Sequence, residues 1–233
     1  MSDTEQEQCL RMINRSQRNA IARVKNLDWL IITTGSAFIY NLKETGTFVG
    51  NCHKAPNKIF DKKLLSVSQI TDAFENVISK LLELTPNLKV LFTVSPVRYT
   101  RDGVVENNLS KAILLQATHQ LVEQNKQASY FPAYELVIDD LRDYRFFKED
   151  LVHPNQQAIE YVWGKFESAC IDSDSLKILE QLKQIIKAKE HRPLHPESIE
   201  HQAFRKQNFE QARQLMEKYP YLDLKEEESF FKS

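Results

Sequence analysis

Three short apolar runs alternate with longer segments of helical spacing, and this order constrains the fold more than any other feature of the chain. The runs are Trp29–Thr34, Lys89–Val94 and residues 134–138, and each is followed by a small or polar residue. Continuous apolar runs of this length are typical of strands that are buried on both faces of a parallel sheet.

The predicted helices lie before, between and after these runs. They cover residues 4–25, 66–84, 108–124 and the stretch after Pro154, and each places apolar residues three or four positions apart. Ser66 and Gln69 have the spacing of a capping box, which marks the start of a helix. This alternation predicts an α/β fold with three layers (αβα), in which crossover helices connect parallel strands.

The last part of the chain has a different character, because it is strongly charged and contains no apolar run. We expect helices at residues 176–186 and 197–218, separated by the segment His191-Arg192-Pro193-Leu194-His195-Pro196. The predicted organisation is a partial α/β domain over residues 1–170 and a helical extension over residues 171–233 that packs on it.

Composition excludes several classes of function. A formal net charge of -1 creates no field that would gather nucleic acid or acidic lipid. Three cysteines far apart lack the spacing of zinc sites and of disulfide frameworks. His191, His195 and His201 have no acidic or cysteine partners at metal-ligand spacing and fit loop histidines next to prolines. The N-terminus is acidic and no apolar stretch is long enough to span a bilayer. We expect a cytoplasmic protein without metal, organic cofactor, nucleic-acid partner or membrane partner.

Candidate functional residues follow the predicted strands, because ligands of open parallel sheets bind outside the carboxyl ends of the strands. Asp150 and His153 are three residues apart in such a position. The Asp150 carboxylate can hold Nδ1 of the imidazole, which leaves Nε2 to act as a base for a hydroxyl nucleophile. The alternative is that Asp150 caps a turn and that His153 only starts the next helix.

The chain resembles the GSCFA family of the SGNH (GDSL-type) hydrolases from Leu27 to its C-terminus. The matching segments are Asn51-Cys52-His53-Lys54-Ala55-Pro56, Phe92 to Arg98, Asp102-Gly103, Glu106-Asn107, Ser110-Lys111-Ala112, Tyr130 to Glu135, Leu141 to Phe146, Asp150 to His153, and His191-Arg192-Pro193. The resemblance implies a Ser-His-Asp mechanism on a small-molecule or glycan O-acyl ester, with His153 as general base and Asp150 as its orienting carboxylate. Hydrolysis and acyl transfer both fit, and no cofactor is implied.

The serine of this mechanism is the missing part. The family's Gly-Ser-Cys-Phe-Ala block follows its first strand, and Gly35-Ser36-Ala37-Phe38 is a near-match. However, Asn51-Cys52-His53-Lys54 follows too closely, since in the family a later strand leads into that motif. We therefore expect strands 3, 4 and 5 of a 2-1-3-4-5 sheet, with strands 1 and 2 and the serine block absent. Ser36 is then a small residue at a tight strand-to-helix turn, where Gly35 supplies backbone freedom.

Several alternatives stay open. Ser36 could be the nucleophile, and Gly35, Asn51 and His53 could bind the oxyanion or the substrate. Arg98 could clamp an anionic group of the substrate, or it could join a lattice with Arg142, Asp143 and Arg145 that holds loops together. The free edge of the first predicted strand could pair two copies of the chain. The rival to an esterase is a non-catalytic interaction or structural module that keeps the late strands of the fold.

Overall fold

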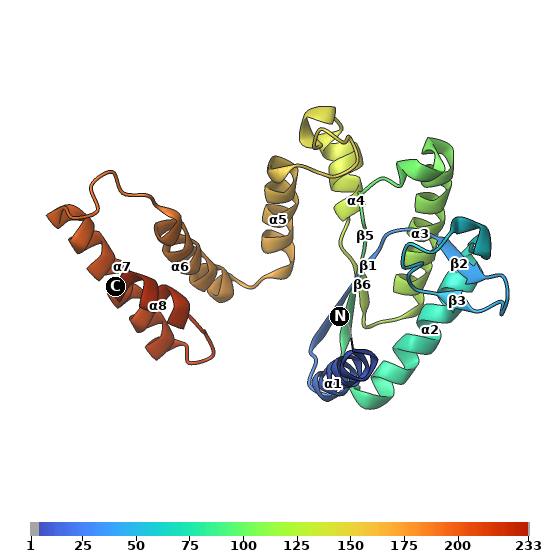
Figure 1. The fold of residues 1–233 in the computed structure, drawn as a ribbon, viewed down its shortest axis with the longest axis horizontal. Helices are drawn as coiled ribbons and strands as arrows, with labels where there is room; N and C mark the ends of the chain where they lie inside the picture. Colours follow the sequence, from blue (N-terminus) through green and yellow to red (C-terminus); the bar gives the residue numbers. More distant parts are fainter. Residues whose placement is uncertain (1–4, 233) are drawn as a thin grey trace. The chain divides into compact units, whose positions relative to one another are not determined.

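The computed structural model describes residues 5–232, except for the side chain of Asp102. The chain forms two compact units, one that extends to Trp163 and one that begins at Gly164 (Figure 1). Within the described residues, no helix has the length and the apolar character that crossing a bilayer demands.

The first unit contains a parallel sheet of three strands. β1 (Trp29–Thr34), β5 (Lys89–Val94) and β6 (Ala128–Tyr130) lie in the order β1-β5-β6. The first two predicted strands therefore occur at the predicted residues, and the α/β prediction is confirmed at this level. β5 is the central strand, and its side chains from 90 to 94 are all buried. β1 is an edge strand, with the side chains of Trp29 and Ile31 half exposed.

The third predicted strand is wrong. Residues 134–138 are helical, because α4 (Ala133–Glu135) continues into a π-helical turn (Leu136–Leu141). The strand that pairs with β5 is the preceding β6, which is only three residues long. A short apolar run such as Leu136-Val137-Ile138 fits a buried helical turn as well as a strand, and Pro132 immediately before α4 favours a helix start.

Helices α2 (Val67–Leu84) and α3 (Val104–Gln124) cover one face of the parallel sheet (Figure 1). The core between these layers consists of buried aliphatic and aromatic side chains from both helices, β5 and the turn before β5. Its fully buried members are Ile78, Leu88, Val90, Phe92 and Leu121. The ring of Phe92 also meets Phe74 edge to face, with ring centroids 5.5 Å apart. This core anchors the sheet whose carboxyl edge carries the candidate site.

The ends of the helices follow local rules. The predicted capping box at Ser66 is present, since Ser66 and Gln69 exchange both side-chain to backbone hydrogen bonds. α3 begins earlier than predicted, directly after Gly103. Gly103 has a φ of 95°, and a Cβ at this position would lie 2.5 Å from Oε2 of Glu106. Only glycine fits there without displacing the Glu106 side chain.

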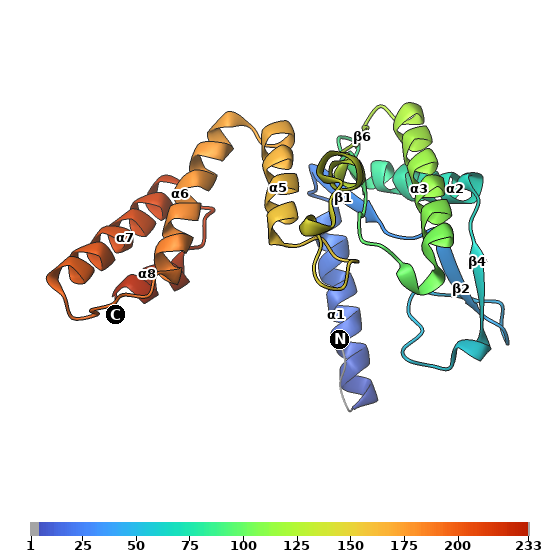
Figure 2. The same cartoon turned by 90° about the horizontal axis from the view of Figure 1, so that it is seen from above.

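α1 (Gln6–Val24) confirms the first predicted helix, and the predicted start at Thr4 lies outside the described residues. Figure 2 shows α1 projecting from the rest of the first unit, and none of its residues is buried. Its C-terminal end is fixed by the Thr85 hydroxyl, which donates to the carbonyl oxygen of Val24 at 2.9 Å.

A second sheet was not predicted from the sequence. β2 (Phe38–Leu42), β3 (Phe48–Val49) and β4 (Phe60–Leu64) are antiparallel and lie in the order β3-β2-β4, with a 3-10 turn (Asn57–Ile59) before β4. Gly35 and Ser36 therefore lead from one strand into another. The expected strand-to-helix turn is wrong, because the helix that crosses back to the parallel sheet begins only at Val67.

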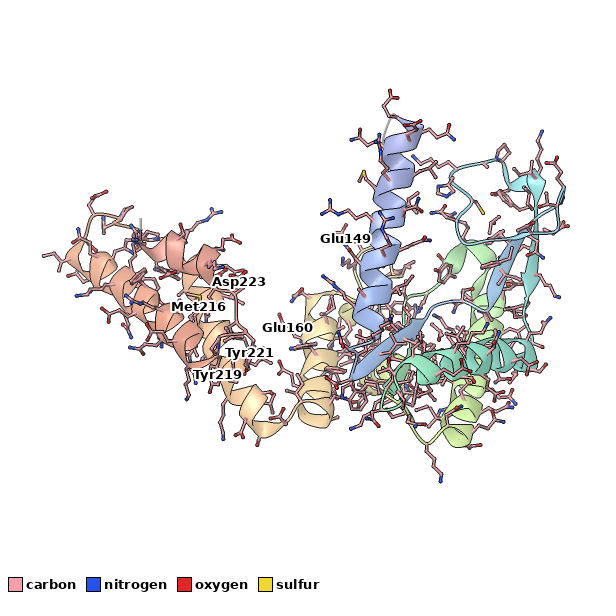
Figure 3. The ribbon with its side chains drawn as sticks, turned by 90° about the horizontal axis from the view of Figure 1, so that it is seen from below. Glu149, Glu160, Met216, Tyr219, Tyr221 and Asp223 are labelled. Atoms are coloured by element: carbon pink, nitrogen blue, oxygen red, sulfur yellow. The ribbon has the colours of Figure 1, made fainter. Side chains whose placement is uncertain are left out.

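A 3-10 turn (Tyr144–Phe146) and α5 (Gln156–Cys170) follow the π-helical turn. The second unit contains α6 (Ser173–Glu190), α7 (Ile199–Lys218) and α8 (Lys225–Lys232), of which α8 was not predicted. Tyr219 and Tyr221, labelled in Figure 3, lie between α7 and α8 with ring centroids 6.0 Å apart. The three helices share an apolar core of Ile185, Ala212, Leu215, Leu224 and Phe231.

Candidate active site

Asp150 and His153 form a close pair. Oδ2 of Asp150 lies 2.7 Å from Nδ1 of His153. Oδ1 accepts the backbone N–H groups of Val152 at 2.9 Å and of His153 at 3.0 Å. The backbone N–H of His153, that of Val152 and the imidazole together hold the pKa of Asp150 down to about 2. Asp150 is therefore an anion at neutral pH, and it both caps the turn and contacts the ring.

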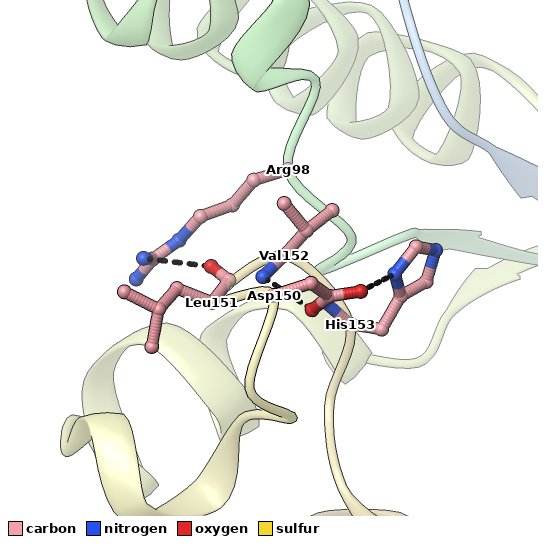
Figure 4. A network of polar contacts seen from close by, with 5 residues as sticks. All are labelled: Arg98, Asp150, Leu151, Val152 and His153. Atoms are coloured by element: carbon pink, nitrogen blue, oxygen red, sulfur yellow. Dashed lines mark hydrogen bonds and ion pairs between the residues drawn. The ribbon is translucent and has the colours of Figure 1, made fainter.

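The imidazole is arranged so that its second nitrogen is available. With Asp150 ionised, Nδ1 of His153 carries a proton and donates it to the carboxylate. Nε2 then has a free lone pair, and it points away from Asp150 (Figure 4). The side chains are 53% exposed for His153 and 47% exposed for Asp150, so a reacting hydroxyl can reach Nε2 from outside. The alternative in which His153 starts a helix does not apply, because α5 begins at Gln156.

A short hairpin presents this pair. The backbone N–H of Lys148 donates to the carbonyl oxygen of His153 at 2.8 Å. The backbone N–H of Asn155 donates to the carbonyl oxygen of Phe146 at 2.9 Å. Leu151 lies at the tip with a φ of 56°, in the left-handed region. This turn directs the N–H groups that follow Leu151 toward the Asp150 carboxylate.

Ser36 lies at the carboxyl end of β1, and its hydroxyl is engaged in the turn. Oγ of Ser36 accepts the backbone N–H of Phe38 at 3.1 Å and lies 3.4 Å from Oγ of Ser110. Ser110 in turn accepts the backbone N–H of Ala37 at 2.8 Å. Among residues 5–232, no hydrogen bond joins Ser36 to His153. These contacts are those of a residue that stabilises a turn.

Gly35 is not required by its backbone conformation. Its φ lies outside the left-handed region, and an added Cβ would only touch the ring of Tyr99 at 3.8 Å, an ordinary contact. The expectation that Gly35 supplies backbone freedom is therefore wrong. A cavity of about 190 Å³ adjoins this turn. Its lining combines Gly35, Ser36 and Thr34 with the apolar Ala37, Leu65, Ile70, Ala73, Phe74 and Leu114.

Lys111 is the residue of this region that sequence reasoning missed. Its ammonium nitrogen donates to the carbonyl oxygens of Gly35 and Ser95, each at 2.6 Å, and the residue is only 2% exposed. Burial lowers the pKa of Lys111 to about 8. Since Gly35 follows β1 and Ser95 follows β5, Lys111 ties together the carboxyl ends of two adjacent strands. The available signal was a lysine on the buried stripe of α3, four residues after Asn107 and three before Leu114.

The other predicted residues lie in two places. Asn51 and His53 belong to the loop between β3 and β4, where Oδ1 of Asn51 accepts the backbone N–H of His53 at 2.8 Å. In the described part of the chain, no hydrogen bond or ion pair connects this loop to Ser36 or to the Asp150 pair. Arg98 does reach the pair, since its Nη1 lies 3.4 Å from the carbonyl oxygen of Leu151 (Figure 4).

Asp143, which we expected in a lattice with the nearby arginines, makes a local capping contact. Its carboxylate accepts the backbone N–H of Arg145 at 2.8 Å and so caps the 3-10 turn. Arg142 has a φ of 57° and ends the π-helical turn. As for metals, the described residues contain no cluster of three or more histidine, cysteine, aspartate or glutamate side chains that could hold an ion.

Comparison with known proteins shows the family of the chain. The family model described as GSCFA family matches residues 1–166, well over half of the 233 residues. The chain belongs to the GSCFA family. A second model, described as the C-terminal domain of GSCFA domain proteins, matches residues 182–233. No curated protein and no solved structure matches the chain. All candidate site residues of this GSCFA protein, Lys111 included, lie within the first matched range, and none lies in the second unit.

Proposed function

We propose that this GSCFA chain supplies the His-Asp pair of an SGNH-type hydrolase that acts on O-acyl esters. The observation that carries the proposal is the 2.7 Å contact between Asp150 and Nδ1 of His153, with Nε2 accessible from outside. In this mechanism Nε2 removes the proton of a serine hydroxyl as it attacks the ester carbonyl. The imidazolium then protonates the leaving alcohol, while Asp150 keeps the ring oriented and stabilises its charge.

The proposal assigns Ser36 a structural role. Support comes from its hydroxyl, which already accepts the Phe38 N–H and neighbours Ser110, and from the turn, which leads into β2. The attacking serine then belongs to a segment outside residues 5–232 or to another polypeptide. Water resolves the acyl-enzyme in a hydrolase and a sugar hydroxyl resolves it in a transferase, so small-molecule and glycan esters both fit the pair.

The role of Ser36 can be tested with a fluorophosphonate probe, which labels activated serines. We expect the wild-type chain and Ser36→Ala to show the same labelling, because no base contacts the Ser36 hydroxyl among the described residues. Ser95→Ala is the matched control, since Ser95 also follows a strand of the parallel sheet. Labelling that disappears in Ser36→Ala and persists in Ser95→Ala would overturn the structural assignment.

The ester-cleaving function needs its own measurement. We expect hydrolysis of p-nitrophenyl acetate when the chain is assayed together with the serine-bearing segment, and loss of that activity in His153→Gln. The rival function, a non-catalytic module, is favoured by one observation: the described residues place no hydroxyl within hydrogen-bond distance of His153. Absence of hydrolysis with the serine-bearing segment present would support this rival.

A further inference from the structure

Arg98 contacts the hairpin of Asp150 and His153 through both its backbone and its side chain. The backbone N–H of Arg98 donates to the carbonyl oxygen of Val152 at 3.3 Å. Its Nη1 donates to the carbonyl oxygen of Leu151 at 3.4 Å (Figure 4). Both hydrogen bonds are long, but they fall on two consecutive carbonyls between the two members of the pair. Arg98 itself lies four residues after the last residue of β5.

Two aromatic rings fix the guanidinium in this position. Its central carbon lies 4.3 Å from the ring centroid of Phe147 and 5.2 Å from that of Tyr144. Phe147 is buried, and its backbone pairs with Pro154 at the base of the same hairpin. A cation over the face of an aromatic ring is attracted by the negative charge density of that face, more strongly where water is excluded. Arg98 is therefore held against both strands of the hairpin rather than extended into solvent.

The hairpin needs such support because its tip is strained. Leu151 has a φ of 56°, in the left-handed region, where the Cβ of a non-glycine residue crowds the following carbonyl oxygen. The same conformation aims the N–H groups of Val152 and His153 at the Asp150 carboxylate. If the turn relaxed, Asp150 would lose these donors and His153 would lose its orientation.

We propose that Arg98 is a positioning residue, which locks the strained turn of residues 150–153 to the end of β5 and so fixes the direction of the His153 ring. The proposal rests on the proposed function only in taking His153 as the base. It differs from a role in substrate binding, because the contacts of the guanidinium are with the protein's own carbonyl oxygen and rings. Arg98 therefore acts through Asp150 and His153 and not on the substrate.

The first test reads the geometry of the turn without any activity. We expect the pKa of the Asp150 carboxyl, followed by ¹³C NMR in the intact chain, to rise in Arg98→Met from about 2 toward the ordinary aspartate value of about 3.9. Arg98→Lys should give nearly the same rise, since lysine keeps the charge but lacks the planar group that packs on the rings of Phe147 and Tyr144. Arg101→Met, which removes a nearby exposed arginine, is the matched control and should leave the titration unchanged.

A milder variant covers the case in which Arg98→Met does not fold. Tyr144→Leu removes only the more exposed ring, and we expect a smaller rise of the Asp150 pKa in the same direction. An Asp150 titration that is identical in wild type and Arg98→Met would overturn the positioning role. A wild-type Asp150 titration in Arg98→Lys would also overturn it, because the positive charge alone would then explain the pKa rise seen in Arg98→Met.

A second test measures ester hydrolysis with the serine-bearing segment present. If Arg98 positions the pair, we expect Arg98→Met to lower kcat by roughly tenfold to a hundredfold with little change in KM, because small displacements of a reacting group have effects of this size. A rise in KM at constant kcat would instead assign Arg98 to substrate binding. If the NMR shift occurs while no variant of the pair affects hydrolysis, the positioning role stands and the proposed function fails.

Discussion

Replacement of His153 by glutamine is expected to lower the rate of ester hydrolysis, measured with the serine-bearing segment present, by a factor of about 10³, within the range that a single acid-base group contributes. Glutamine keeps a polar side chain of similar reach but cannot take up a proton. His153 is half exposed, and within the described residues its ring hydrogen-bonds only to Asp150. The substitution should therefore change the free energy of unfolding by less than about 0.5 kcal/mol. Steady-state kinetics and urea unfolding measure the two quantities.

His119→Gln is the matched control for this experiment. His119 is also an exposed histidine, and its ring packs against Tyr130 with centroids 4.9 Å apart. Its replacement should leave hydrolysis at the wild-type rate. Equal rates in wild type and His153→Gln would remove His153 from the mechanism, whereas a parallel loss in both variants would point to a general effect on the fold.

The second large effect is expected at Lys111. Lys111→Met should lower the free energy of unfolding at neutral pH by about 2–4 kcal/mol, because two partly buried carbonyl oxygens each lose a donor worth about 1–3 kcal/mol. The oxygens are those of Gly35 and Ser95, which Lys111 holds at 2.6 Å. Methionine fills the channel of the lysine stem but cannot donate a hydrogen bond. Lys80→Met, on the exposed side of α2, is the control and should be nearly neutral.

The stability difference between wild type and Lys111→Met should also depend on pH, and the sign is fixed by the lowered pKa. Below about pH 8 the lysine is protonated in both the folded and the unfolded chain. Between about 8 and 10.5 the unfolded chain still binds this proton and the folded chain does not, so wild-type stability rises with pH relative to the variant. At about 1.4 kcal/mol per pH unit, the gap should widen by roughly 3 kcal/mol across this window. A gap that stays constant between pH 7 and pH 10 would show that Lys111 titrates normally.

The predictable parts of the fold are those whose signal is local. β1 and β5 are continuous apolar runs that end at a small or polar residue, and Ser66 with Gln69 specifies the start of α2. The prediction of a strand at residues 134–138 was wrong because a buried π-helical turn and a buried strand both require a short run of apolar side chains. The second sheet escaped prediction because β4 carries Asp61, Lys62 and Lys63 in succession, which removes the alternation of a half-buried strand.

The candidate site divides in the same way. Asp150 and His153 are three residues apart, so their pairing can be deduced from sequence spacing and backbone geometry. Lys111 contacts Gly35 across 76 residues and Ser95 across 16, and Arg98 contacts Leu151 across 53. Such contacts depend on how the crossovers place α3 and the hairpin against the sheet. No local pattern contains that information.

The edge of β1 that does not pair with β5 runs toward the candidate site. The carbonyls of Asp28 and Thr34 accept hydrogen bonds from the backbone N–H groups of Lys89 and Ser95. The alternate residues of β1, which are Trp29, Ile31 and Thr33, therefore direct their backbone N–H and C=O groups away from β5. A strand added there, from a second copy or another segment, would pair with β1, which ends one residue before the Gly35 carbonyl that Lys111 contacts. Strand addition and ligand binding at the carboxyl edge would then be thermodynamically coupled, and each would change the affinity of the other by the same factor.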